Sequence, residues 1–259
     1  MINNYFDFFN KNDNEFLKII VKDFDTISFK ISSLLELNKN EIHIWLIYID
    51  LYKSNTLFFE NLLCNDEVNK MNSFYFEKDK ERFAITHGLL RILISRYLNL
   101  PNNLIKFEKD LYGKPKVFID DKNINFNISH SNNLIAFAFS SSATIGIDVE
   151  YNKNINDFND IVTNYFHEIE IENFNKVSNL KKQDIFYRYW TQKEAFLKAT
   201  GEGLNRSLSS FYIQNKFDNY YKVNDENYSG YIWNIISFNI LDNYTASICF
   251  KHDKLGEYY

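Results

Sequence analysis

Residues 145–150 read Ile145-Gly146-Ile147-Asp148-Val149-Glu150, a run in which β-branched residues alternate with a glycine and two acids. Successive side chains of a β-strand point to opposite faces, so the two acids share one face and the isoleucine and valine between them face a core. Two adjacent carboxylates repel each other unless a cation or a proton lies between them. A divalent ion with oxygen ligands, such as magnesium, would relieve that repulsion. Two solvated acids at an exposed strand end are the simpler explanation of this stretch taken alone.

A second stretch, Phe186–Ala199, has the periodicity of a helix and places Trp190, Glu194 and Lys198 four residues apart on one face. A surface ion pair between the glutamate and the lysine, worth ~0.2–0.5 kcal/mol, is the ordinary interpretation. The tryptophan one turn earlier indicates instead that this face is covered. A half-buried glutamate beside a lysine is an environment suited to phosphate and metal.

A third stretch, Phe126–Ser131, ends a predicted strand with Ser129 and His130 side by side. No Gly-x-Ser-x-Gly elbow surrounds the serine, which argues against nucleophilic catalysis. Both residues are better suited to hydrogen-bonding a phosphate, and a purely structural histidine is the alternative.

The surrounding sequence predicts helices and strands in two successive groups. Residues 1–40 are mostly helical in pattern, with Phe16, Leu17, Ile20 and Phe24 at roughly helical spacing. Further helices are expected at 79–98, 156–175 and 182–199, the last capped by Gly201. Strands are expected at 42–49, 105–108, 117–119, 125–128, 134–140 and 144–149, and several more over 209–250, of which 244–250 is the clearest. We therefore expect an α+β fold with an N-terminal extension over 1–40, a first half over 41–143 and a second half over 144–259 that carries the metal ligands.

Composition excludes several classes of protein. Of 259 residues, 45% are hydrophobic and 18% aromatic, which is too much core material for a disordered chain. The net charge of −5 provides no global basic field for nucleic acid. Two cysteines are too few for a disulfide scaffold and lack the paired spacing of a zinc site. No targeting signal or membrane span is visible, so we expect a soluble, cytoplasmic protein that binds neither nucleic acid nor membrane.

Four motifs, taken in chain order, resemble those of the 4′-phosphopantetheinyl transferases of the larger, surfactin-synthetase-activating type. The motifs are Tyr112-Gly113-Lys114-Pro115, Phe126–Ser131, Ile145–Glu150 and Trp190–Lys198. The resemblance covers about residues 41–250. It implies a pseudo-dimer of two similar α+β halves with coenzyme A in the cleft between them. It also implies transfer of the phosphopantetheine arm to a serine of an acyl or peptidyl carrier protein, with release of 3′,5′-adenosine bisphosphate, by an enzyme for which a monomer suffices.

The resemblance also implies roles for individual residues. Asp148, Glu150 and Glu194 would bind magnesium, with manganese as an alternative. The implied contacts to coenzyme A are Arg82, Lys114, Ser129, His130, Lys193 and Lys198. Glu194, Lys198 and His130 would be catalytic. The glutamate, or a metal-bound water that it holds, would be the general base, and the other two would be donors to the accumulating negative charge. Glu170 falls near a further acidic position of the family.

Two other functions stay open on the sequence alone. One is a non-catalytic module that binds carrier proteins. The presence of all three acids, at 148, 150 and 194, argues against it, because a site that had lost its activity would be expected to have lost one of them. The other is a magnesium-dependent hydrolase of nucleotides or coenzyme A. The pathway also stays open, because fatty-acid, polyketide and peptide-synthetase carriers are all candidates. Lys181, Lys182 and Arg188 are candidates for a local basic patch that attracts an acidic carrier.

Overall fold

The computed structural model describes residues 4–10, 15–23, 34–109, 113–117, 124–240 and 243–252. The chain is α+β and divides into two compact units, each discontinuous in sequence. The first comprises Met1–Asp110, Pro115–Ile124 and Asn133–Ser141, and the second comprises Leu111–Lys114, Asn125–Asn132 and Ser142–Tyr259. Each unit consists of three separate segments, whereas the predicted halves, 41–143 and 144–259, are continuous ranges. Within the described part of the chain, no helix has both the length and the apolar content needed to cross a membrane.

The first unit is built on a mixed sheet with the strand order β1-β2-β3-β7. Its strands are β1 (Asn4–Asn10), β2 (Glu15–Asp23), β3 (Glu41–Tyr48) and β7 (Leu134–Ser140). The β2 and β3 strands are parallel, whereas β1 pairs with β2 and β7 with β3 in the antiparallel sense. A second, two-stranded sheet joins β4 (Phe107–Lys109) to β5 (Pro115–Val117).

The helices of the first unit precede these short strands. They are α1 (Thr56–Glu60), α2 (Asn65–Asn72) and α3 (Glu77–Leu98), with short 3₁₀ turns η2 (Ile49–Leu51), η3 (Lys53–Asn55) and η4 (Asn102–Leu104). The helix predicted over 79–98 is therefore confirmed as α3. Its Tyr97 ring packs against Phe139 of β7, and its hydroxyl accepts a hydrogen bond from Trp45 of β3 at 2.8 Å.

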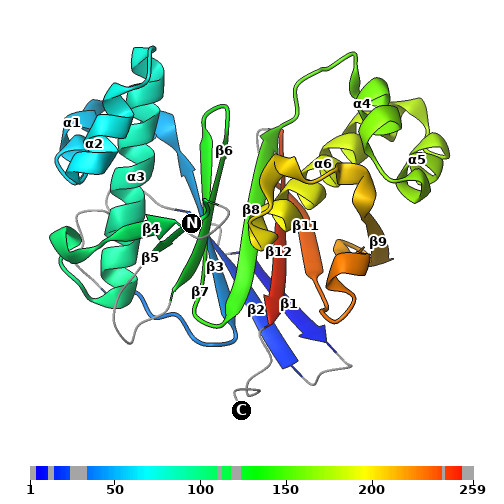
Figure 1. The fold of residues 1–259 in the computed structure, drawn as a ribbon, viewed down its shortest axis with the longest axis horizontal. Helices are drawn as coiled ribbons and strands as arrows, with labels where there is room; N and C mark the ends of the chain where they lie inside the picture. The colour runs from blue at the N-terminus through cyan, green and yellow to red at the C-terminus, as the bar shows by residue number, and fades with distance from the viewer. Residues whose placement is uncertain are drawn as a thin grey trace. The chain divides into compact units, whose positions relative to one another are not determined.

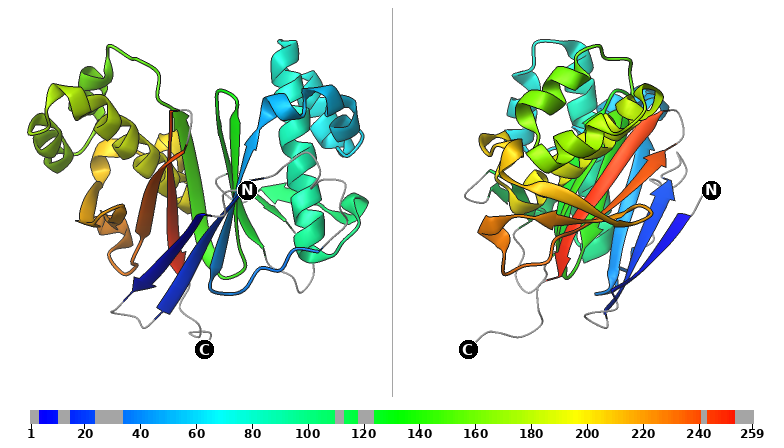
Figure 2. Two further views of the ribbon diagram at one scale, coloured as in Figure 1. Left: turned by 180° about the vertical axis from the view of Figure 1, so that it is seen from behind. Right: turned by 90° about the vertical axis from the view of Figure 1, so that its right-hand side faces the viewer.

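The helical pattern expected near the N-terminus is wrong for the described residues. The β2 strand covers Glu15–Asp23 and pairs in parallel with β3, while β1 extends the same sheet (Figure 2). The run Ile19-Ile20-Val21 is β-branched and buried, and such residues favour a packed strand over a helix. Phe24, the last residue of the expected helical stripe, lies outside the described residues.

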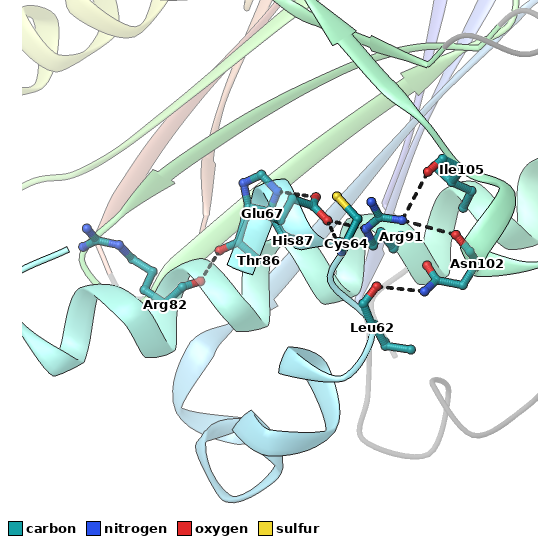
Figure 3. A network of polar contacts seen from close by, with 9 residues as sticks. All are labelled: Leu62, Cys64, Glu67, Arg82, Thr86, His87, Arg91, Asn102 and Ile105. Carbon is teal, nitrogen blue, oxygen red and sulfur yellow. Dashed lines mark hydrogen bonds and ion pairs between the residues drawn. The ribbon is translucent and has the colours of Figure 1, made fainter. Parts of the chain in front are cut away.

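A buried ion pair ties α2 to α3 (Figure 3). Arg91 donates from Nε to Glu67 at 2.5 Å and from Nη1 to the carbonyl oxygens of Asn102 and Ile105. The ring of His87 lies 3.0 Å from the other oxygen of Glu67. The carboxylate therefore replaces its lost hydration with charged and polar partners, as a buried acid must.

The second unit is a five-stranded sheet in the order β8-β12-β11-β10-β9, antiparallel throughout, with helices against it (Figure 1). The strands are β8 (Ala143–Tyr151), β9 (Tyr212–Phe217), β10 (Tyr220–Asn224), β11 (Asn234–Ile240) and β12 (Tyr244–His252), and β6 (Asn125–Ser131) belongs to the same unit. The helices are α4 (Phe158–Tyr165), α5 (Glu168–Asn175) and α6 (Asn179–Thr200), with 3₁₀ turns η5 (Gly203–Asn205), η6 (Leu208–Ser210) and η7 (Glu226–Tyr228).

Helix α6 supplies much of this unit's core and ends as predicted. Phe186, Phe196 and Leu197 are buried against residues of α4, α5 and the sheet. Gly201 caps the helix with φ 85°, in the left-handed region that glycine adopts without steric cost. The single helical stretch expected over 156–175 is divided in two. The α4 helix ends because the backbone of Phe166 is extended, and α5 begins where the carboxylate of Glu170 accepts a hydrogen bond from the backbone N–H of His167.

Candidate active site

The backbones of β8 and α6 approach each other closely at Gly146. A Cβ atom at this position would lie 2.2 Å from the carbonyl oxygen of Ala195 and 2.3 Å from the amide nitrogen of Ala199. Real Cβ atoms are essentially never found below 3.0 Å from such atoms. Glycine is required here for close approach, and that approach sets the strand carrying the two acids against the helix carrying Glu194 and Lys198.

The alternation predicted for β8 is confirmed. Ile147 and Val149 are fully buried, whereas Asp148 and Glu150 lie on the opposite face, which they share with Gly146. Asp148 is 4% exposed, and its Oδ1 accepts hydrogen bonds from Lys198 Nζ at 2.7 Å and from Ser129 Oγ at 2.9 Å. The structure therefore brings together residues from all three predicted stretches.

Glu150 and Glu194 complete the acidic group. Glu150 is partly buried, and its Oε2 accepts a hydrogen bond from Ser131 Oγ at 2.7 Å. Glu194 is also partly buried and lies one helical turn before Lys198. The charges of Asp148, Glu150 and Lys198 all act on Glu194, so the carboxylates interact although they are far apart in sequence.

Burial raises the pKa values of all three acids, and repulsion by Asp148 adds to the rise for Glu150 and Glu194. Burial is the largest cause for Asp148, and the positive charge of Lys198 opposes it. Burial raises the pKa of Glu150, which the charge of Asp148 raises further and the hydrogen bond from Ser131 lowers. Burial and then the charge of Asp148 raise the pKa of Glu194 to about 7. A poorly hydrated group of like charges favours uptake of a proton or a cation.

The donor chemistry of these residues fits a divalent cation. Asp148 Oδ2 and Glu194 Oε1 are buried and have no hydrogen-bond partner among the described residues. Carboxylate oxygens of this kind are the ligands that magnesium prefers. The described residues nevertheless contain no group of three or more acidic, histidine or cysteine side chains already close enough together to hold one ion. Binding by all three acids would therefore require at least one of their side chains to rotate.

Lys193, an expected contact to coenzyme A, lies inside the protein. Lys193 is 0% exposed, and its Nζ lies 2.7 Å from Glu170, which is also fully buried. The same ammonium donates to the carbonyl oxygens of Leu208 and Phe211, so its three hydrogens are used inside the protein. Glu170 in turn accepts a hydrogen bond from the backbone N–H of Ile213. This pair fixes α6 against its neighbours, and both side chains are buried; the contact of Lys193 with coenzyme A stays a prediction.

Two other expected contacts lie within the second unit. Lys114 Nζ donates to the carbonyl oxygens of Ile145 and Ala199 at 2.9 and 3.1 Å, which links β8 to the end of α6. His130 is exposed and lies on the opposite face of β6 from Ser129, because adjacent residues of a strand diverge. Their roles toward coenzyme A stay predictions.

Arg82 lies in the first unit, on α3. Its guanidinium forms an ion pair with Asp79 at 2.9 Å and points away from the buried network around Glu67 (Figure 3). The side chain is 35% exposed, so it is accessible to a ligand. Its proposed contact with coenzyme A stays a prediction.

Sequence reasoning assigned no role to Ser131 and did not predict a cavity beside Glu150. The cavity has a volume of about 560 Å³, and its lining includes Ser131, Glu150, Ile155, Phe186, Tyr187 and Trp190. Trp190 lies near Glu150 and lowers the pKa of that acid. The polar residues at every second position of β6 were the available signal, but a sequence does not say what such side chains contact.

Known proteins of one family match this chain. Residues 144–249 match the family model described as the 4′-phosphopantetheinyl transferase superfamily, and residues 52–142 match that for the N-terminal part of a 4′-phosphopantetheinyl transferase. The chain is 36% identical over 172 residues to the 4′-phosphopantetheinyl transferase HetI of Nostoc, covering 66% of this chain and 73% of that protein. It is 30% identical over 201 residues to the 4′-phosphopantetheinyl transferase Sfp of Bacillus subtilis, covering 77% and 87%.

A human relative matches over a smaller share of both chains. The L-aminoadipate-semialdehyde dehydrogenase-phosphopantetheinyl transferase of Homo sapiens is 31% identical over 153 residues, which cover 55% of this chain and 50% of that protein. The chain belongs to the 4′-phosphopantetheinyl transferase superfamily. Within that superfamily it has the two-halved form of the larger, Sfp-like type.

Proposed function

We propose that this enzyme transfers the 4′-phosphopantetheine group of coenzyme A to a serine hydroxyl of an acyl or peptidyl carrier protein. The serine oxygen would bond to the phosphorus atom that carries pantetheine, and the pyrophosphate bridge would break. The products are the modified carrier and 3′,5′-adenosine bisphosphate. The observation that carries the proposal is the buried contact of Asp148 with Lys198, beside two further acids, in a chain of this family.

Asp148, Glu150 and Glu194 would hold a magnesium or manganese ion. Such an ion supplies Lewis acidity and neutralises charge on the phosphates when it is bound. Asp148 Oδ2 and Glu194 Oε1 support this assignment, because both are buried and neither has a hydrogen-bond partner among the described residues. An ion bound there would satisfy oxygen atoms that the described residues leave without a partner.

Glu194 is the best candidate for the general base. With no cation bound, burial and the charge of Asp148 raise its pKa to about 7, near the neutral pH at which an acid–base catalyst is most effective, and a bound cation would lower it. Glu194 would take the proton of the incoming serine hydroxyl. Lys198, held by Asp148 and Ser129, keeps a positive charge beside the site and would stabilise the negative charge that develops on the phosphates.

The test is transfer to a panel of fatty-acid, polyketide and peptidyl carrier proteins, measured as the added phosphopantetheine mass. We expect Asp148→Ala and Glu194→Gln each to abolish transfer while circular dichroism shows an intact fold. Glu172→Gln, at an exposed acid of α5, is the matched control and should transfer normally. Transfer to no carrier, or near-normal turnover by either site variant, would contradict the proposal. Release of products without a carrier would indicate a hydrolase instead.

A further inference from the structure

The β6 strand contacts β8 through side chains. Asn125 Nδ2 donates to the carbonyl oxygen of Ala143 at 2.9 Å. At every second position after Asn125, a β6 side chain accepts a hydrogen bond from a backbone amide of β8. Asn127 accepts from Ile147 at 2.9 Å, Ser129 from Val149 at 3.3 Å and Ser131 from Tyr151 at 3.0 Å. Because side chains of a strand alternate, one face of β6 makes all four contacts.

The two serines of this face also contact the acids. Ser129 Oγ donates to Asp148, and Ser131 Oγ donates to Glu150 at 2.7 Å. A hydroxyl has one hydrogen and two lone pairs. When Ser131 accepts the amide of Tyr151 with one lone pair, its single hydrogen points to Glu150. The backbone of β8 thus fixes the hydroxyl, and the hydroxyl fixes the carboxylate.

Glu150 needs such a constraint more than Asp148 does. Asp148 is buried and is also held by Lys198, whereas Glu150 is only partly buried and lines the 560 Å³ cavity. A glutamate side chain with open space beside it samples several rotamers, and ordering it costs conformational free energy. A contact that orders the carboxylate before a ligand arrives removes that cost from binding.

We propose that Ser131 is a positioning residue that orients the Glu150 carboxylate for cation binding. The proposal rests on the proposed function, because it takes Glu150 as a ligand of the ion. In this role Ser131 would touch neither the ion nor the reacting atoms. Residues that hydrogen-bond to metal ligands typically change metal affinity by 10–100-fold when they are replaced.

The test is the binding of Mn²⁺ to the full chain in the presence of coenzyme A, measured by electron paramagnetic resonance as the loss of free-ion signal. We expect Ser131→Ala to weaken Mn²⁺ binding by about tenfold or more. Ser131→Thr keeps the hydroxyl and should restore affinity to within about twofold of the parent chain. Asn125→Ala removes another contact between β6 and β8 that involves no acid, and it should leave affinity unchanged.

The double variant Ser131→Ala/Glu150→Gln separates positioning from general support of the strand. If Ser131 acts through Glu150, the serine substitution has no further effect once the carboxylate is gone. Parent-like Mn²⁺ affinity in a folded Ser131→Ala chain, or an equal loss in Asn125→Ala, would overturn the proposal. Unchanged affinity in Glu150→Gln alone would overturn the ligand set of the proposed function, and with it this inference.

Discussion

Replacing Gly146 by alanine tests the close approach of β8 to α6. The new Cβ atom would lie 2.2 Å from the carbonyl oxygen of Ala195 and 2.3 Å from the amide nitrogen of Ala199. Both are backbone atoms, so no side chain can rotate away. The strand and the helix must separate by about 0.8 Å to reach even the 3.0 Å below which real contacts are essentially absent.

This separation has a cost in stability and a cost in function. Overpacking a core costs roughly 1–3 kcal/mol, and a clash between two backbones belongs at the upper end, about 3 kcal/mol. For a chain of this size that lowers the melting temperature by roughly 6–12 °C. The 2.7 Å contact between Lys198 and Asp148 would also stretch beyond a good hydrogen bond. A displacement of about 1 Å in an active site costs on the order of 100-fold in rate.

Urea and thermal unfolding measure the first effect, and transfer of phosphopantetheine to a carrier protein measures the second. Gly230→Ala is the matched control, because a Cβ atom there meets nothing within 4 Å. We expect the control to stay within about 0.5 kcal/mol of the parent chain and to transfer normally. A Gly146→Ala variant that unfolds and transfers like the control would refute the close packing of β8 on α6 and the role given to it.

Three further predictions concern other parts of the molecule. Burial raises the pKa of Glu67, but hydrogen bonds from His87 and from the backbone N–H of Cys64 lower it more strongly, together with the charge of Arg91. The resulting pKa is about 2. A folded pKa of about 2 against the ordinary 4.5 corresponds to about 3 kcal/mol, which solvent screening of this incompletely buried group reduces to about 2 kcal/mol. Because the folded pKa is the lower one, this stability is present above pH 4.5 and is lost as the pH falls through 2. Glu67→Gln should remove this pH dependence from urea unfolding, while Glu77→Gln, at an exposed acid, should not. Lys193→Met should destabilise the chain by about 3–5 kcal/mol because it leaves the Glu170 charge buried and unpaired, and adding Glu170→Gln should recover part of that loss. Additive losses in the double variant would contradict a direct ion pair. Chelation should abolish transfer and either Mg²⁺ or Mn²⁺ should restore it, whereas full activity in chelator would remove the metal from the mechanism.

Local patterns in the sequence were sufficient for the strand and the helix that carry the acids. The alternation in 145–150 predicts a strand with both acids on one face. The four-residue spacing of Trp190, Glu194 and Lys198 predicts a helix with these three side chains on one face. The N-terminal strands could not be predicted in this way. The β2 strand is stabilised by pairing with β3, and such a partner is not encoded in the local spacing of apolar residues.

The contacts of individual polar residues were the least predictable part of the site. Lys193 and Lys198 are both lysines on one helix, yet one is fully buried against Glu170 and the other reaches Asp148. The difference depends on which elements pack against each side of α6. Ser131 was likewise visible as a polar residue next to a histidine, but its bond to Glu150 requires the register of β6 against β8.

The discontinuity of the second unit limits how that unit can be divided into fragments. A polypeptide that starts at Ser142 would include Asp148, Glu150, Glu194 and Lys198, yet it would lack Lys114 and all of β6. The amides of Ile147, Val149 and Tyr151 would lose their acceptors, and the carbonyl oxygen of Ala199 would lose its ammonium partner. A split version of the enzyme should therefore need a separate peptide spanning 113–132 to restore that edge, so the acids alone do not make a transplantable module.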